Sequence, residues 1–205
     1  MIECREYENI GLDPIRLFFL TILTVGYFTY NHMSAESRGV ENYSEALEAY
    51  KSSDYEKAYE EFAKVPSGST LKPSALFRQA RCATNMDKKE LAIKKYNRIV
   101  HSSVKSSIAP ISEYNMANLM FEIQDKGAKK HFKKIIKKYP TSDYAVAANY
   151  YLGLIEVSNP PKRERGLKKS KNRAFIYFKN YLEEAPGGRF ALKTIDAVSY
   201  THLTL

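Results

Sequence analysis

The sequence predicts an all-α fold in which short helical hairpins stack into a solenoid, and three observations support that class. Residues 43–65 read as two short helices around a tight turn, with Ala58 and Phe62 forming an i, i+4 pair on one face. The pair recurs 34 residues later as Ala92 and Tyr96. Proline and Gly/Ser clusters separate the units, as they do where helices end. A hairpin cannot bury its apolar face alone, so a fixed repeat of this length predicts stacking.

Composition allows a folded domain of ordinary size, because 44% of the 205 residues are apolar and 13% are aromatic. The formal charge of +9 is unevenly distributed. Residues 36–64 carry eight acids and four bases, whereas residues 126–173 carry fourteen bases and three acids. One end of the array is therefore predicted to be acidic and the other strongly basic.

An apolar stretch lies near the N-terminus, after a short segment over residues 1–16. Residues 17–30, LFFLTILTVGYFTY, are apolar or weakly polar throughout. We predict a transmembrane helix or signal-anchor over residues 17–33, although the fully apolar part is shorter than the roughly 17–25 residues of a spanning helix. A cleaved signal peptide and a buried helix of a soluble domain are the alternatives.

Charges around this stretch bear on its orientation. Arg5 and Arg16 favour a cytoplasmic N-terminus, which would place the repeats outside the cytoplasm. A cleaved signal normally begins with a basic leader, but the residues ahead of this stretch include the acids Glu3, Glu6, Glu8 and Asp13.

The rest of the chain divides into a polar linker over residues 34–41 and a repeat domain over residues 42–196. Pro73 suits the first turn of a helix, and Pro140 ends one. An insertion of about a dozen residues from Asn159 separates the last two helices, where other turns have two or three. The predicted helices are 42–52, 55–64, a pair within 73–101 turning near 85–87, 111–124, 127–138, 142–157 and 171–185. This gives about four repeats and the start of a fifth.

A longer motif links the last two units. Ala128-x3-Phe132-x7-Pro140-x3-Tyr144-Ala145 recurs as Ala174-x3-Phe178-x7-Pro186-x3-Phe190-Ala191. With the 34-residue period, these motifs give the chain a resemblance to tetratricopeptide repeat (TPR) proteins over about residues 42–196. Segments of its sequence are similar to segments of TPR proteins from the bacterial cell envelope. That group includes the lipoprotein of the outer-membrane barrel assembly machinery and the periplasmic partner of the Tol-Pal system. That lipoprotein has a cysteine directly after its apolar leader, and this chain has none there.

The last nine residues, 197–205, depart from the repeat pattern. AVSYTHLTL is rich in β-forming residues and matches a translation of the transposon end used in sequencing libraries. We interpret it as an artefactual tail and leave it out of the fold and function predictions.

No catalytic, cofactor-binding or metal-binding constellation is evident, so the sequence favours a non-enzymatic protein. The four histidines are scattered, and no phosphate-binding loop or nucleophile elbow occurs. Cys4 and Cys82 lack the spacing of a metal or redox motif.

The TPR resemblance implies a concave groove lined by the first helix of each repeat. Family groove positions lie three before and one, four and five after the small residue of that helix, here Ala46, Ala80 and, in the third repeat, Met116. They imply a partner-binding groove of Tyr43, Leu47, Tyr50, Lys51, Phe77, Arg81, Thr84 and Asn85. The third repeat would add Glu113, Ala117, Met120 and Phe121. For the aromatic members, packing between repeats is the alternative to ligand contact.

The basic region suggests a second surface. In the insertion and the helix after it, the candidates are Lys162, Arg163, Arg165, Lys168, Lys169, Lys171 and Arg173. Such a patch fits an acidic partner, anionic lipid or nucleic acid, or is simply a solvated lysine-rich surface. Nucleic acid is disfavoured, because no aromatic residues interleave for base stacking.

These observations predict a membrane-anchored TPR scaffold that binds another protein or peptide in the cell envelope, with the repeats in the periplasm. A secreted protein with a cleaved signal is one alternative. The other is a basic protein that binds anionic lipid or nucleic acid through residues 126–173.

Overall fold

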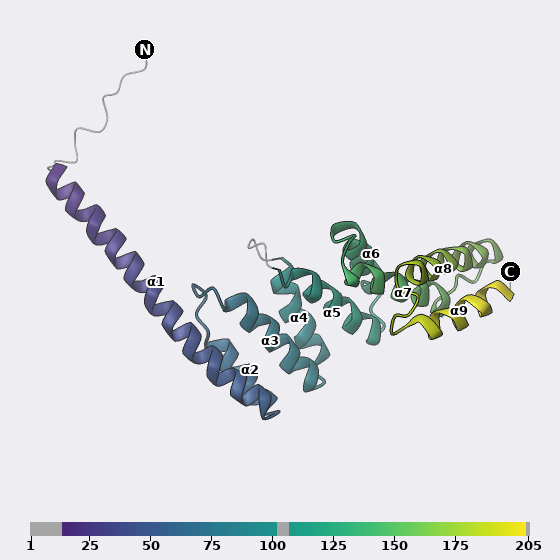
Figure 1. Cartoon of the computed structure of the whole chain (residues 1–205), viewed down its shortest axis with the longest axis horizontal. Coiled ribbons are helices and arrows are strands. Elements are labelled where there is room, and N and C mark those ends of the chain that lie inside the picture. The colour runs from purple at the N-terminus through teal and green to yellow at the C-terminus, as the bar shows by residue number, and fades with distance from the viewer. Residues whose placement is uncertain (1–13, 102–106, 204–205) are drawn as a thin grey trace, which may run out of the picture.

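The computed structural model describes residues 14–101 and 107–203, and every regular element in them is an α-helix. Helical hairpins stack side by side into an elongated array, and α1 projects from one end (Figure 1). The predicted all-α solenoid is therefore confirmed. The helices are α1 (Pro14–Lys51), α2 (Tyr55–Lys64), α3 (Lys72–Asn85), α4 (Lys89–Val100), α5 (Ala109–Glu122), α6 (Ala128–Lys138), α7 (Asp143–Ser158), α8 (Glu164–Glu184) and α9 (Ala191–Leu203).

The turns of the first three hairpins share one backbone geometry. Their central residues Ser53, Asp87 and Gln124 adopt positive φ values of 63°, 55° and 58°. In each turn, the backbone N–H of the residue after the positive-φ residue donates to the carbonyl five residues earlier. In the first turn the Asp54 N–H donates to the Ala49 carbonyl, and this bond ends the first helix. Equivalent turns therefore mark equivalent positions in the three repeats.

This geometry corrects the predicted register of the third repeat. The small residues Ala46 and Ala80 each precede their turn residue by seven positions, and the residue seven before Gln124 is Ala117 rather than Met116. Met116 was predicted from the spacing of the small residues in the second helices, Ala92 and Ala128. That spacing misplaces the first helix by one residue, because the turns differ in length. Three residues separate Gln124 from Ala128, whereas four separate Asp87 from Ala92.

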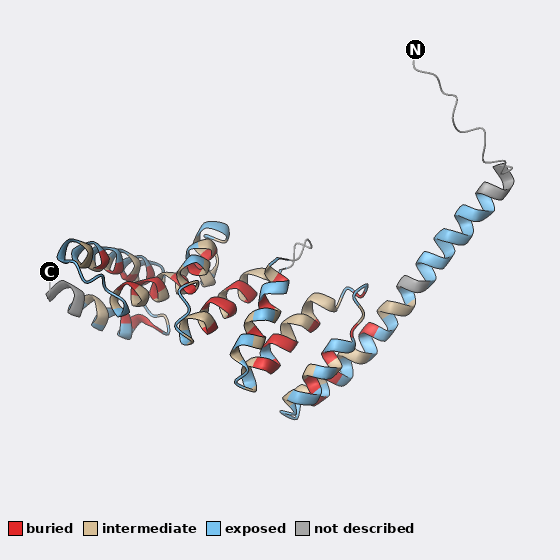
Figure 2. Cartoon of the chain, turned by 180° about the vertical axis from the view of Figure 1, so that it is seen from behind, coloured by how far each residue is buried: buried red, intermediate tan, exposed pale blue. Residues whose placement is uncertain are grey.

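One packing contact between aromatic rings recurs in all four hairpins and lies against the buried residues of the interior (red in Figure 2). An aromatic ring three residues before the small residue meets an aromatic ring of the second helix. In the fourth hairpin the small residue is Gly153, where a Cβ would lie 2.3 Å from the Phe178 ring. The pairs are Tyr43–Phe62, Phe77–Tyr96, Tyr114–Phe132 and Tyr150–Phe178, with ring centroids 5.2, 5.8, 6.4 and 6.3 Å apart.

Residues 34–41, predicted as a linker, are helical within α1, which is a correction. Their contacts with the loop between α2 and α3 explain this. Glu36 accepts a hydrogen bond from the Thr70 N–H at 2.9 Å, and Gly39 packs so closely on Ser69 that a Cβ would lie 2.4 Å from its Oγ. Asn42 donates to the Lys64 carbonyl at 3.1 Å. Tertiary contacts thus hold this polar stretch in the helix.

The N-terminal half of α1 stands clear of the array, and its described side chains are exposed (Figure 2). Within residues 14–101 and 107–203, no helix combines the length and hydropathy needed to cross a membrane. The transmembrane helix predicted over residues 17–33 is therefore not supported. Threonines and tyrosines such as Thr21, Thr24 and Tyr27 dilute the hydropathy of this stretch.

The C-terminal helices differ from the prediction in two places. Much of the insertion after Asn159 is helical, because α8 begins at Glu164 rather than near residue 171. The α9 helix runs on to Leu203, so residues 197–203 do not break the helical pattern. Ala197 and Val198 pack on the core of the last hairpin, which favours helix over the β-structure their composition suggested. The origin of residues 197–205 stays a prediction.

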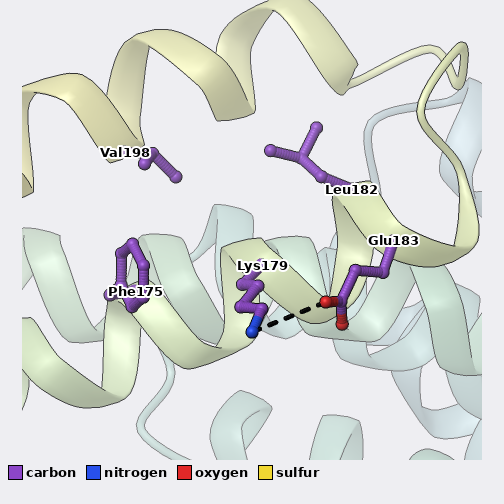
Figure 3. A pocket seen from close by; sticks show the side chains of 5 residues that line it. All are labelled: Phe175, Lys179, Leu182, Glu183 and Val198. Carbon is purple, nitrogen blue, oxygen red and sulfur yellow. Dashed lines mark ion pairs between the residues drawn. The ribbon is translucent and has the colours of Figure 1, made fainter.

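A hollow of about 390 Å³ lies between α8 and α9, lined by Phe175, Lys179, Leu182, Glu183 and Val198 (Figure 3). Lys179 forms an ion pair at 3.6 Å with Glu183, one turn further along the same helix. Val198 belongs to the stretch that we interpret as an artefact, so we assign this hollow no function.

Candidate functional site

A polar hollow of about 290 Å³ lies between the C-terminal halves of α3 and α5, the first helices of adjacent repeats. Three of the eight predicted groove residues, Arg81, Thr84 and Asn85, line it together. The α5 helix supplies Asn115, Asn118, Leu119 and Glu122, and α4 supplies Tyr96. We call this surface the polar groove.

The polar groove follows the family positions once the register is corrected. Arg81 and Asn85 stand one and five residues after Ala80, and Asn118 and Glu122 stand one and five after Ala117. Asn118 and Glu122 are absent from the predicted groove because the family positions of the third repeat were counted from Met116. The signal that could have placed them is the turn sequence Gln124-Asp125, which aligns with Asp87-Lys88.

Hydrogen bonding leaves one acceptor in the polar groove open. The Oδ1 atom of Asn118 is buried and has no hydrogen-bond partner within the described chain. Its neighbour Asn115 donates to the Tyr96 hydroxyl at 3.4 Å. Burial raises the pKa of Tyr96, against the lowering effect of hydrogen bonds from Asn115 and Thr84. A buried unpaired acceptor costs about 1–3 kcal/mol, so a donor from a ligand would be favoured here.

Tyr50 extends the site toward α1. The guanidinium carbons of Arg78 and Arg81 lie 5.5 and 5.6 Å from its ring centroid, and Asn85 donates to its hydroxyl at 3.4 Å. These contacts fix Arg81 beside the polar groove. The predicted residue Lys51 lies apart, exposed and paired with Glu48 at 2.8 Å.

The other predicted groove residues turn toward the interior. Tyr43 and Phe77 stack edge-on against Phe62 and Tyr96, and Leu47 packs on the core of the first hairpin. In the third repeat, Glu113 is fully buried, with Lys134 Nζ and His131 Nδ1 at 2.8 and 3.1 Å from its carboxylate. Packing between helices therefore accounts for these positions.

The predicted basic residues line α8 and the segment before it, and all but Lys171 are exposed. One of them, Arg173, has a structural contact. Its Nη2 lies 2.8 Å from the buried carboxylate of Glu156, which Lys129 of α6 approaches at 2.7 Å from the other side. The Ser170 hydroxyl donates to the same carboxylate at 2.7 Å. Part of the basic charge therefore compensates a buried acid.

This environment shifts the ionisation of Glu156. Its side chain is 2% exposed, and burial alone would raise its pKa. Hydrogen bonds from Arg173, Lys129 and Ser170 outweigh burial and bring the pKa down to about 2. Glu156 also raises the pKa of Arg173. The pair is therefore charged at neutral pH.

The fold and the polar groove define a helical-hairpin solenoid with an open surface between its first helices. The sequence pattern of the tetratricopeptide repeat family matches residues 74–106 and 112–142, which span the second and third hairpins. The chain is a tetratricopeptide repeat protein. No curated protein matches it significantly. Tetratricopeptide repeats are protein-binding modules, so the comparison supports a protein-interaction scaffold.

Proposed function

We propose that this protein is a non-enzymatic scaffold that binds an extended segment of a partner protein in the polar groove. The observation that carries the proposal is the buried, unpaired Oδ1 of Asn118, in a hollow lined by Arg81, Asn85 and Asn115. An extended peptide has no internal hydrogen bonds, so its N–H and C=O groups need partners at such a surface.

The chemistry of the groove supports a peptide backbone as the ligand. Asparagine side chains carry both a donor and an acceptor, as a peptide unit does. Arg81 and Glu122 place opposite charges in the same lining. The Nζ atom of Lys89 lies 3.1 Å from the Glu122 carboxylate and adds another charged group at this edge of the groove. A polar, mixed-charge groove favours main-chain recognition with few apolar anchors.

The test is a peptide-display selection against the full chain, followed by affinity measurement with an Asn118→Ala variant. We expect selected peptides to lose about tenfold in affinity, because one lost hydrogen bond in a desolvated site is worth roughly 1–1.5 kcal/mol. Asn97→Ala is the matched control, since Asn97 lies exposed on α4, outside the groove. Peptides that bind both variants equally well would refute the groove as the binding site.

We also propose that the exposed half of α1 attaches the repeats to a membrane of the cell envelope, with the repeats outside the cytoplasm. The support is a helix whose large apolar side chains meet solvent on every side. Each is at least 47% exposed: Phe18, Phe19, Leu20, Ile22, Leu23, Val25, Tyr27, Phe28, Tyr30 and Met33. A contiguous apolar surface of this kind marks a membrane or protein contact.

Fractionation of expressing cells, with protease digestion of intact spheroplasts, tests the attachment. The wild-type chain is expected in the membrane fraction and digested from outside, and a Leu23→Glu/Phe28→Glu variant is expected to move largely to the soluble fraction. Leu192→Glu on α9 is the control, because Leu192 is 79% exposed outside this segment. A wild-type chain that stays soluble inside the cell would overturn the attachment.

A further inference from the structure

A second hollow, of about 340 Å³, lies where the start of α7 meets the end of α8. It sits at the N-terminal ends of the first helices, whereas the polar groove sits at their C-terminal ends. Four aromatic residues line it: Tyr114 of α5, Tyr144 of α7, Tyr181 of α8 and Phe190 just before α9. We call it the aromatic hollow.

Packing holds these rings in place. The rings of Tyr114 and Tyr144 lie 5.5 Å apart, and those of Tyr181 and Phe190 lie 6.1 Å apart. Phe190 stacks on Tyr150 at 4.2 Å, and its N–H donates to the Tyr181 hydroxyl at 3.0 Å. Tyr181 and Phe190 are 3% and 8% exposed, so the base of the hollow is formed before any ligand arrives.

The charged groups of the aromatic hollow are two acids and one base. Asp143 and Glu184 are exposed in its lining, and neither makes an ion pair in the part of the chain that the structure describes. The base is Arg189, whose guanidinium carbon lies 4.6 Å from the Phe190 ring centroid. A cation thus already occupies one ring face, and the lining keeps a net charge of −1.

We propose that the aromatic hollow binds the cationic side chain of a lysine or arginine from a partner polypeptide. The ring faces attract a cation, the aliphatic stem covers the rings, and the carboxylates of Asp143 and Glu184 pair with the charged end. An anionic group would meet two unpaired carboxylates. An uncharged side chain would gain from the rings but would leave the carboxylates without a partner.

This site is separate from the polar groove, so the inference stands whether or not a peptide binds there.

The probes are the blocked amino acids N-acetyl-lysine methylamide, its arginine counterpart, the uncharged isostere N-acetyl-norleucine methylamide, and N-acetyl-glutamate methylamide. Each is titrated into the full chain labelled on its tyrosine rings, and the ring resonances are followed by NMR. We expect the lysine and arginine probes to bind at least tenfold more tightly than the norleucine and glutamate probes.

Three variants test the assignment. Tyr144→Ala and Asp143→Asn/Glu184→Gln should each weaken binding of the lysine probe at least fivefold. Arg189→Gln should strengthen it, because it removes the competing cation. Asn97→Ala, exposed on α4 and outside both hollows, is the control and should leave the affinity unchanged. Equal binding of the lysine and norleucine probes would overturn the proposal, as would unchanged affinity in Asp143→Asn/Glu184→Gln. Circular dichroism of each variant confirms that the helices are retained.

Discussion

Replacing Lys129 and Arg173 by methionine is expected to lower the free energy of unfolding by about 3–5 kcal/mol, because it leaves the buried carboxylate of Glu156 without its cations. Ser170 would then be the remaining donor among the described contacts of this carboxylate. A single hydroxyl cannot offset the cost of burying a charge. Urea unfolding of the wild-type and variant chains, followed by far-UV circular dichroism, measures the difference.

Two controls separate this effect from a general loss of lysine charge. Lys130→Met/Lys133→Met alters two exposed lysines of α6 and is expected to change the free energy of unfolding by less than about 0.5 kcal/mol. Adding Glu156→Gln to the Lys129/Arg173 variant should restore much of the stability, since it removes the stranded charge. A loss no larger than that of the Lys130/Lys133 control would mean that the cations do not stabilise Glu156.

Acid is expected to remove about 3 kcal/mol of stability through Glu156 alone. Its pKa is about 2 in the folded chain and near the ordinary value of 4.5 when unfolded. The unfolded state therefore binds the proton more readily, and the stabilisation is complete above pH 4.5 and lost as the pH falls toward 2. Urea unfolding over this pH range should show a steeper fall for the wild type than for Glu156→Gln.

Glu113 contributes with the same sign. Burial would raise its pKa, but hydrogen bonds from His131 and Lys134 lower it further than burial raises it. Because Glu113 is present in both chains, the difference between wild type and Glu156→Gln isolates Glu156. Parallel pH profiles for the two chains would contradict the assignment.

Much of the fold could be predicted because the signals of a helical hairpin are local. Asp54 hydrogen-bonds the Lys57 N–H and begins α2, and Pro73 and Pro110 lie in the first turns of α3 and α5. The small residues Ala58, Ala92 and Ala128 follow directly from the repeat. The length of α1 could not be predicted, because residues 34–41 are held by contacts with a loop about 30 residues away.

The functional surfaces were predictable only in part, for a physical reason. The family positions lead to Arg81, Thr84 and Asn85, which line the polar groove, but the same positions also include Tyr43 and Phe77, which pack inside. A helix position fixes the direction of a side chain, whereas the size of the neighbouring residues decides whether it is buried. The aromatic hollow joins the ends of separate helices, and no local pattern in the sequence marks it.

The contact of Glu156 also has a mechanical consequence. In a solenoid each repeat touches only its neighbours, so a pull on the two ends is carried through every interface in series. At α7 the carboxylate of Glu156 connects α6 on one side to α8 on the other. At α3 the corresponding link between α2 and α4 runs through the side-chain amide of Gln79. Its N–H donates to the Tyr59 carbonyl, and its oxygen accepts a hydrogen bond from Lys95. The α6–α8 link depends on charge and the α2–α4 link on an uncharged amide. Under tension, acid that protonates Glu156 would therefore weaken the C-terminal half of the array first.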